Sequence, residues 1–155
     1  NNISSSVYSY GPQYLENGFH PDTFIEMATP SLKSIKNINI GDILIHNNKV
    51  IGKVRISPKY IHYYKDSNNN LVTTNTKIFH KGIWKNIELV PKIEPEKGLH
   101  NVVACNIITE DSTIQVNGNC IYRDYIEVQD EYIENQILMI IDFMLHLPCR
   151  LVIDS

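Results

Sequence analysis

The most constraining feature of this chain is a succession of short β-type segments, separated by turn residues, that runs from Gly18 to Val128. The segment 101–109 is apolar and β-branched, which is typical of a strand buried on both faces. Asn117 and Gly118 separate two such segments and favour a hairpin with a type I′ turn. Residues 65–70 are all charged or small polar residues, so they can only form a loop. The pattern predicts a mainly β domain. Its expected strands are Thr23–Met27, Ile43–Ile45, Val50–Ile56, Lys59–Tyr64, Leu71–Thr74, Lys77–Phe79, Ile83–Leu89, Asn101–Thr109, Thr113–Val116 and Cys120–Tyr122.

The segment after these strands has a different period. Asp130 is an expected N-cap, and Pro148 ends the pattern. Residues 1–17 show no clear period. We therefore expect an extended arm over 1–17, a β domain over 18–128, and a helix with a tail over 129–155. The apolar residues that recur every three or four positions, as on one face of a helix, are Ile133, Ile137, Ile140, Ile141, Met144 and Leu145.

Length and charge exclude several classes of protein. The chain has 155 residues, which suits one domain, and its 14 basic and 17 acidic side chains leave a net charge of −3. Beyond Lys59–Lys65 there is no basic stripe of the kind that binds nucleic acid. The most apolar stretch, 137–147, is shorter than the about 20 residues that a membrane span needs. We therefore expect neither nucleic acid nor a membrane as a partner.

Residue types that carry chemistry are sparse. Cys105, Cys120 and Cys149 form no C-x-x-C pair, and the histidines form no pair at metal-ligand spacing. This pattern predicts reduced thiols in a reducing compartment, with no metal and no cofactor. Cys120 is a candidate nucleophile because Arg123, close by in the sequence, would lower the pKa of its thiol.

Three blocks of the strand region occur in an order and spacing that match a known set of motifs. The first begins with Gly-Phe-His-Pro-Asp-Thr-Phe-Ile at 18–25 and continues through Ile-Gly-Asp at 40–42 and Val50–Val54. The second is the strand Val72–Phe79, and the third is 101–125. Together these blocks, over 18–128, resemble the hedgehog/intein (Hint) family. The resemblance implies a twisted all-β horseshoe, here followed by one C-terminal α-helix.

The resemblance also implies an activity, which is self-processing of the chain. In the family, an opening Cys attacks the peptide carbonyl before it, a His of the second block assists the departing amide nitrogen, and in inteins a closing His-Asn pair cleaves the far end. This sequence departs from the family at each of these places. Gly has no side chain to attack with, and a Thr hydroxyl cannot supply an acid with a pKa near 7. We therefore expect a catalytically inactive domain. The departing positions are Gly18, Thr76, Ser112, Arg123 and Asp124.

A structural or protein-binding role is then the expected function. The arm is rich in Tyr, a residue enriched at protein interfaces. The final helix is apolar over more than half its circumference, so it either packs deeply on the β domain or docks on another chain. The Asn-rich composition and the Arg-Asp-Tyr sequence at 123–125 indicate a large-virus or phage setting, so the expected partners are other virion proteins or a second copy of this chain. The alternative is a domain that still cleaves itself through a rearranged nucleophile such as Cys120 or Ser112. The expected contact residues are Tyr8, Tyr10, Tyr14, Ile137, Ile141 and Met144.

Overall fold

Antiparallel pairing dominates the computed structural model, which describes residues 16–57, 60–125 and 131–145. The helix α1 spans Glu131–Leu145. Short 3-10 turns occupy Ile35–Asn37, Ile45–Asn47 and Ile87–Leu89. The strands are β1 (Phe24–Glu26), β2 (Leu32–Ser34), β3 (Ile43–Leu44), β4 (Asn48–Ile56), β5 (Tyr63–Lys65), β6 (Leu71–Thr73), β7 (Lys77–His80), β8 (Ile83–Asn86), β9 (Pro95–Glu96), β10 (Ala104–Thr109), β11 (Thr113–Val116) and β12 (Cys120–Arg123).

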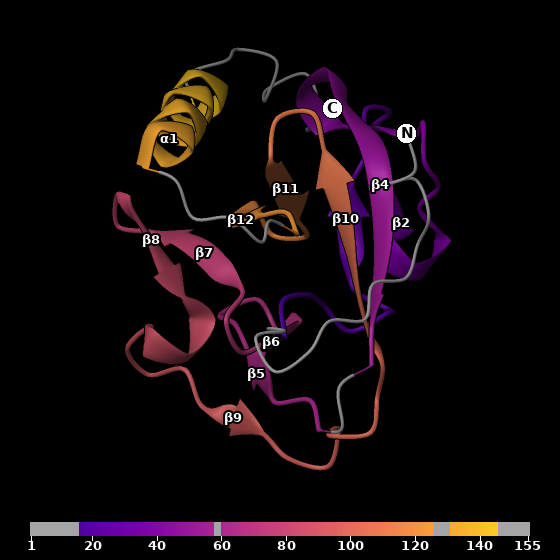
Figure 1. Ribbon diagram of the computed structural model, residues 1–155, viewed down its shortest axis with the longest axis vertical. Helices are drawn as coiled ribbons and strands as arrows, with labels where there is room; N and C mark the ends of the chain where they lie inside the picture. The colour runs from indigo at the N-terminus through magenta and orange to yellow at the C-terminus, as the bar shows by residue number, and fades with distance from the viewer. Residues whose placement is uncertain (1–15, 58–59, 126–130, 146–155) are drawn as a thin grey trace.

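The strands form three sheets that curve into a horseshoe, as expected. The largest has the order β2-β1-β11-β12-β7-β8, and the two smaller ones have the orders β10-β4-β3 and β6-β5-β9. Figure 1 shows β4 and β10 along one side, β7 and β8 along the other, and β5, β6 and β9 at the lower end. β4 alternates buried and more exposed positions along its whole length, so one of its faces lies against the core. β11, in contrast, is buried at every position.

A short segment near residue 19 joins two of these sheets. Phe19 forms isolated antiparallel bridges with both Val72 in β6 and Cys105 in β10. Its ring is fully buried and meets the ring of Tyr122 edge-on, with the centroids 5.1 Å apart. The backbone around residue 18 is therefore held from two sides before the first regular strand begins.

Several boundaries differ from the sequence-based expectation. The predicted strand Ile83–Leu89 ends at Asn86, because Ile87 turns into the core and its N–H donates to the carbonyl oxygen of Thr76 at 2.9 Å. The strand expected over 101–109 begins only at Ala104, after a turn in which the N–H of Val102 donates to the carbonyl oxygen of Leu99. The loop expected over 65–70 lies between β5 and β6, and its prediction was right except for Lys65.

The hairpin between β11 and β12 is confirmed, but its expected turn type is wrong. Val116 pairs with Cys120, so three residues connect the strands rather than two. The positive φ angles fall on Gly118 and Asn119, not on Asn117. The reason is that the N–H of Asn117 still donates to the carbonyl oxygen of Phe24 in β1, which holds this residue in the sheet.

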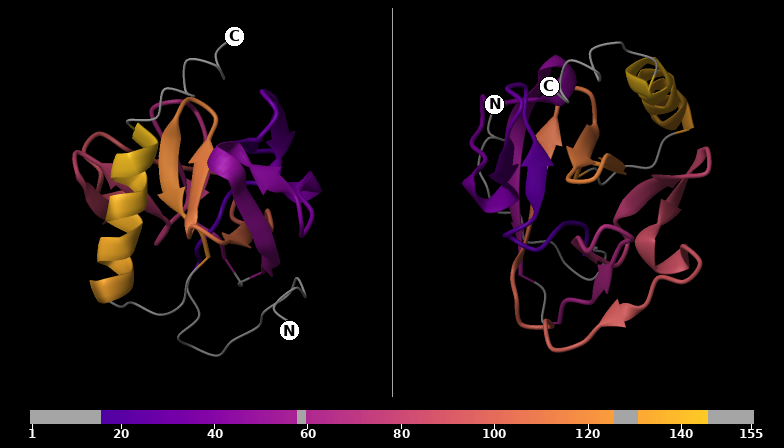
Figure 2. Two further views of the ribbon diagram at one scale, coloured as in Figure 1. Left: turned by 90° about the horizontal axis from the view of Figure 1, so that it is seen from above. Right: turned by 180° about the vertical axis from the view of Figure 1, so that it is seen from behind.

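The helix packs on the domain with the face that was expected to bind a partner. Ile137, Ile141 and Met144 are buried against Ile121 of β12, with Phe79 and Trp84 of the β7–β8 hairpin at the edge of the cluster. Figure 2 shows α1 lying along this side of the strands. These three residues are therefore covered within the domain, contrary to the expectation. Over 137–144, where the burial of the helix is described, the large apolar side chains that are exposed are Met139 and Phe143.

The predicted contact residues Tyr8, Tyr10 and Tyr14 lie outside the described residues, as do the expected N-cap Asp130 and Cys149. Within the part of the chain that the structure describes, no helix has the length and apolar character needed to cross a membrane.

Candidate functional site

The structure brings Gly18 and Thr76 together, as the family resemblance implies. Thr73 lies at the end of β6, and Thr76 lies just before β7, so the turn between these strands presents both hydroxyls to one point. The N–H of Gly18 donates to the Oγ1 atoms of Thr73 and Thr76, at 2.9 Å in each case. Both threonine residues are completely buried. The amide nitrogen at residue 18 is thus enclosed by two neutral hydroxyls.

The carbonyl on the other side of this peptide bond is also bound. Asn106 of β10 is completely buried, and its Nδ2 donates to the carbonyl oxygen of Asn17 at 2.7 Å. The same Nδ2 lies 3.3 Å from Oδ1 of Asn17. One residue earlier, Oε1 of Glu16 accepts the N–H of His62 at 2.6 Å, and Oε2 lies 3.0 Å from Nδ1 of His62. The Asn17–Gly18 peptide bond is therefore fixed at its oxygen, at its nitrogen and upstream.

Gly18 is required at its position by a close approach of the backbone. A Cβ atom built there would lie 2.7 Å from the carbonyl oxygen of Cys105 and 2.9 Å from Cδ1 of Ile56. That carbonyl oxygen is in turn fixed by the N–H of Phe19 at 2.8 Å. There is accordingly no room for any side chain at residue 18, including the thiol that the family carries there.

Ser112, Arg123 and Asp124 form a second group. In it, the backbones of Ser112 and Asp124 are hydrogen-bonded to each other. The N–H of Asp124 donates to the carbonyl oxygen of Ser112 at 3.2 Å, and Oδ2 of Asp124 accepts the N–H of Thr109 at 2.7 Å. Burial raises the pKa of the Asp124 carboxyl to about 7. Arg123, adjacent to it, is buried at the end of β12. Among the described residues, no hydrogen bond links Ser112 or Asp124 to Gly18 or Thr76.

The environment of Cys120 is the opposite of the one expected for a nucleophile. Burial, and next the negative charge of Asp66, raise the pKa of the Cys120 thiol to about 11. Its sulfur accepts a hydrogen bond from Nδ2 of Asn68 at 3.1 Å. The prediction that Arg123 lowers this pKa was wrong, because the sulfur lies beside an acidic side chain that is distant in the sequence.

Asp66 organises the loop between β5 and β6, although it was not among the residues expected from the sequence. Its Oδ1 accepts the N–H groups of Asn68 and Asn70, at 2.8 and 2.9 Å. Its Oδ2 accepts Nδ2 of Asn70 at 2.9 Å and the hydroxyl of Tyr122 at 2.7 Å. An Asp followed by small polar residues is a common signal for such a turn, but the bond to Tyr122 has no local signal.

Replacing Asp66 with Asn is expected to lower the free energy of unfolding by about 2 kcal/mol, because an amide NH₂ group cannot accept the hydrogen bonds that one carboxylate oxygen now receives. Urea denaturation measures this loss. The variant Tyr122→Phe removes only one of the four bonds and serves as the control. Equal losses in the two variants would contradict a shared role of the carboxylate in the loop.

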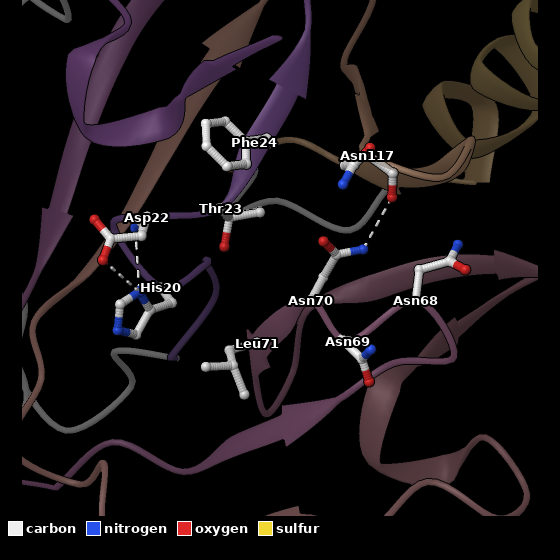
Figure 3. A pocket seen from close by; sticks show the side chains of 9 residues that line it. All are labelled: His20, Asp22, Thr23, Phe24, Asn68, Asn69, Asn70, Leu71 and Asn117. Carbon is white, nitrogen blue, oxygen red and sulfur yellow. Dashed lines mark hydrogen bonds and ion pairs between the residues drawn. The ribbon is translucent and has the colours of Figure 1, made fainter.

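A hollow of about 370 Å³ lies beside this loop. Figure 3 shows His20, Asp22 and Thr23 on one side, with Asn68–Asn70 opposite and Phe24 above. Nδ2 of Asn70 donates to Oδ2 of Asp66 and to the carbonyl oxygen of Asn117, which also lines the hollow. No group of three or more His, Cys, Asp or Glu side chains suited to a metal ion occurs in the described ranges.

Comparison with known proteins identifies the fold of this chain. No protein-family model and no curated protein matches the chain. The solution structure of a bacterial intein-like domain from Clostridium thermocellum is similar, with a TM-score of 0.58 and 17% identity, covering 70% of this chain and 99% of that one. An Ssp DnaB mini-intein variant is similar with a TM-score of 0.55 and 12% identity, covering 75% of this chain and 100% of that one. This chain therefore has the intein-like (Hint) fold.

Proposed function

We propose that this domain keeps an intein-like scaffold without thiol-initiated self-processing, and that it serves as a structural or protein-binding module. The observation that carries the proposal is the closed space at Gly18, where the backbone of Cys105 occupies the place of a Cβ atom. A site that had lost only its nucleophile would still have room for one. The tight packing supports a site that has adapted to glycine.

The remaining departures support the same proposal. Thr76 occupies the place of an acid near the amide nitrogen, yet a hydroxyl ionises far above neutral pH and can only exchange hydrogen bonds. Cys120 and Ser112 are poor substitutes as thiol or hydroxyl nucleophiles. The pKa of Cys120 is raised to about 11, which leaves almost no thiolate at neutral pH. Ser112 has no hydrogen bond to a general base within the described residues.

Exposed apolar side chains support the protein-binding part. Met139 and Phe143 of α1 are each more than 60% exposed, at 65% and 64%. Phe24 and Leu32 on β1 and β2 are each 46% exposed, at the opposite end of the largest sheet from the β7–β8 hairpin. We propose that other virion proteins, or a second copy of this chain, bind these exposed apolar side chains. The tyrosine-rich arm at 1–17 remains a predicted contact element.

Intact-mass spectrometry of the whole chain, incubated with and without a small thiol, tests the proposal. The expected result is that thiol does not accelerate any break in the chain, because no thioester forms at residue 18. Thiol-dependent cleavage between Asn17 and Gly18, or near Asp124, would contradict the loss of the reaction. A chain that is monomeric and carries no other protein when isolated from its natural source would contradict the binding role.

A further inference from the structure

Gly18 has no side chain that could attack the Asn17–Gly18 peptide bond. Asn17, however, has a side-chain amide next to the carbonyl carbon of this bond. We propose that the side-chain amide of Asn17 is the nucleophile of a slow, thiol-independent self-cleavage at this bond. Nδ2 of Asn17 attacks the carbonyl carbon of the same residue, and a C–N bond forms. The C–N bond to Gly18 then breaks, and the proton lost by Nδ2 goes to the Gly18 nitrogen. The products are a succinimide at Asn17 and a free amine at Gly18, with no water or co-reactant consumed.

The carbonyl side of the bond has a fixed hydrogen-bond donor. The N–H of Ile107 donates to Oδ1 of Asn106 at 2.8 Å, which determines the orientation of this buried carboxamide and points Nδ2 toward Asn17. Nδ2 then lies 2.7 Å from the carbonyl oxygen of Asn17. A preorganised donor at this distance polarises the carbonyl and stabilises the negative charge that develops on its oxygen during attack.

The side chain of Asn17 lies next to its own carbonyl. Both Oδ1 and the carbonyl oxygen of Asn17 approach the same atom, Nδ2 of Asn106, at 3.3 and 2.7 Å. The carboxamide therefore lies on the carbonyl side of the bond, with its Oδ1 toward Asn106. A rotation about the Cβ–Cγ bond brings Nδ2 to the side that Oδ1 now occupies, and attack on the carbonyl carbon then closes a five-membered ring.

The nitrogen side favours cleavage over the competing reaction of an Asn-Gly pair. In that reaction, the nitrogen of Gly18 attacks the side-chain carbon of Asn17, the chain stays whole and ammonia leaves. Here the N–H of Gly18 is held by two buried hydroxyls, and Phe19 is paired on both sides. The nitrogen cannot turn toward Asn17 without breaking these bonds. The same hydroxyls can donate as well as accept hydrogen bonds, so one of them can donate to the lone pair of the departing nitrogen.

The test is intact-mass spectrometry of the full chain over days at neutral pH. We expect a fragment ending at Asn17 that is lighter by one water than a hydrolysis product, at a rate that thiol does not change. Asn17→Ala, at a half-buried position, should abolish the fragment. Asn106→Ala should slow its formation by about 100-fold or more, with circular dichroism to confirm that this variant is folded.

A second Asn-Gly pair, Asn117 and Gly118, is an internal control in the same molecule. Its asparagine carbonyl also receives an amide donor, Nδ2 of Asn70 at 3.1 Å, but in the described structure no hydroxyl accepts the N–H of Gly118. Cleavage at both pairs to the same extent would show a property of the dipeptide and overturn the proposal. So would an intact chain, cleavage that survives Asn17→Ala, or loss of ammonia at Asn17 without chain breakage. Thiol dependence, by contrast, bears only on the function proposed above.

Discussion

Replacing Gly18 with alanine is expected to lower the free energy of unfolding by about 3 kcal/mol. The added methyl group would lie within 2.7 Å of a backbone oxygen that belongs to β10 and cannot rotate away. Alanine also restricts the unfolded chain, but that gain is only about 0.5–1 kcal/mol and does not offset the clash. Urea denaturation followed by circular dichroism gives the difference.

Gly52→Ala provides the matched control, because Gly52 lies within β4 and its nearest neighbours are all atoms of the Ile108 side chain, the first at 3.0 Å. A side chain can shift its rotamer, so we expect a loss of about 1 kcal/mol. Gly18→Cys should be as unstable as Gly18→Ala and should show no thiol-dependent cleavage. If both residue 18 variants were as stable as the unchanged protein, the site would have room for a side chain and would not be adapted to glycine.

Stability is expected to fall by about 3 kcal/mol between pH 5 and pH 8 through Asp124 alone. The pKa of this carboxyl is about 7 in the folded protein, above its ordinary value of 3.8, because the group is fully buried. The folded state therefore holds its proton over a pH range in which the unfolded state has lost it. The stabilisation is complete below about pH 4 and is lost as the pH rises through 7. Urea denaturation at a series of pH values measures the slope.

Asp124→Asn is the control for this slope, since an amide imitates the protonated carboxyl in shape and keeps an oxygen for the N–H of Thr109. The variant should be less sensitive to pH and more stable than the unchanged protein at pH 8. The pKa of Asp111 is also raised, by burial and then by Glu110, so a smaller slope of the same sign should remain. A slope unchanged in Asp124→Asn would show that this carboxyl is ionised in the folded state.

Much of the fold was predictable because turn residues and period are local signals. The alternation of β4, the hairpin between β11 and β12 and the helix at Glu131–Leu145 all follow from residues close together in sequence. The errors occur where a distant contact overrides the local preference. Ile87 leaves the strand pattern because it bonds to Thr76, and Asn117 leaves the turn because it bonds to Phe24.

The candidate site was predictable only in part, for the same reason. The positions of Gly18 and Thr76 followed from an ordered set of motifs, and the structure places them in contact. Asn106 was not singled out, because nothing near it in the sequence indicates that its amide faces Asn17. Asp66 was not singled out either, because it lies among other polar residues of a loop. Its negative charge, after burial, raises the pKa of the Cys120 thiol. Burial and charge at these two residues arise from packing between strands, which no local pattern encodes.

The distances in sequence across the opening site determine when that site exists during synthesis of the chain. Gly18 bonds to residues 55 and 58 positions later, and Asn17 bonds to a residue 89 positions later. The ribosome must therefore have synthesised β10 before the Asn17–Gly18 bond can acquire all of its hydrogen-bond partners. Contacts of such long range also form late in folding, since the loop between the partners must close first. The arm and the domain are thus made as one continuous chain, and any chemistry at their junction can begin only after the domain has folded.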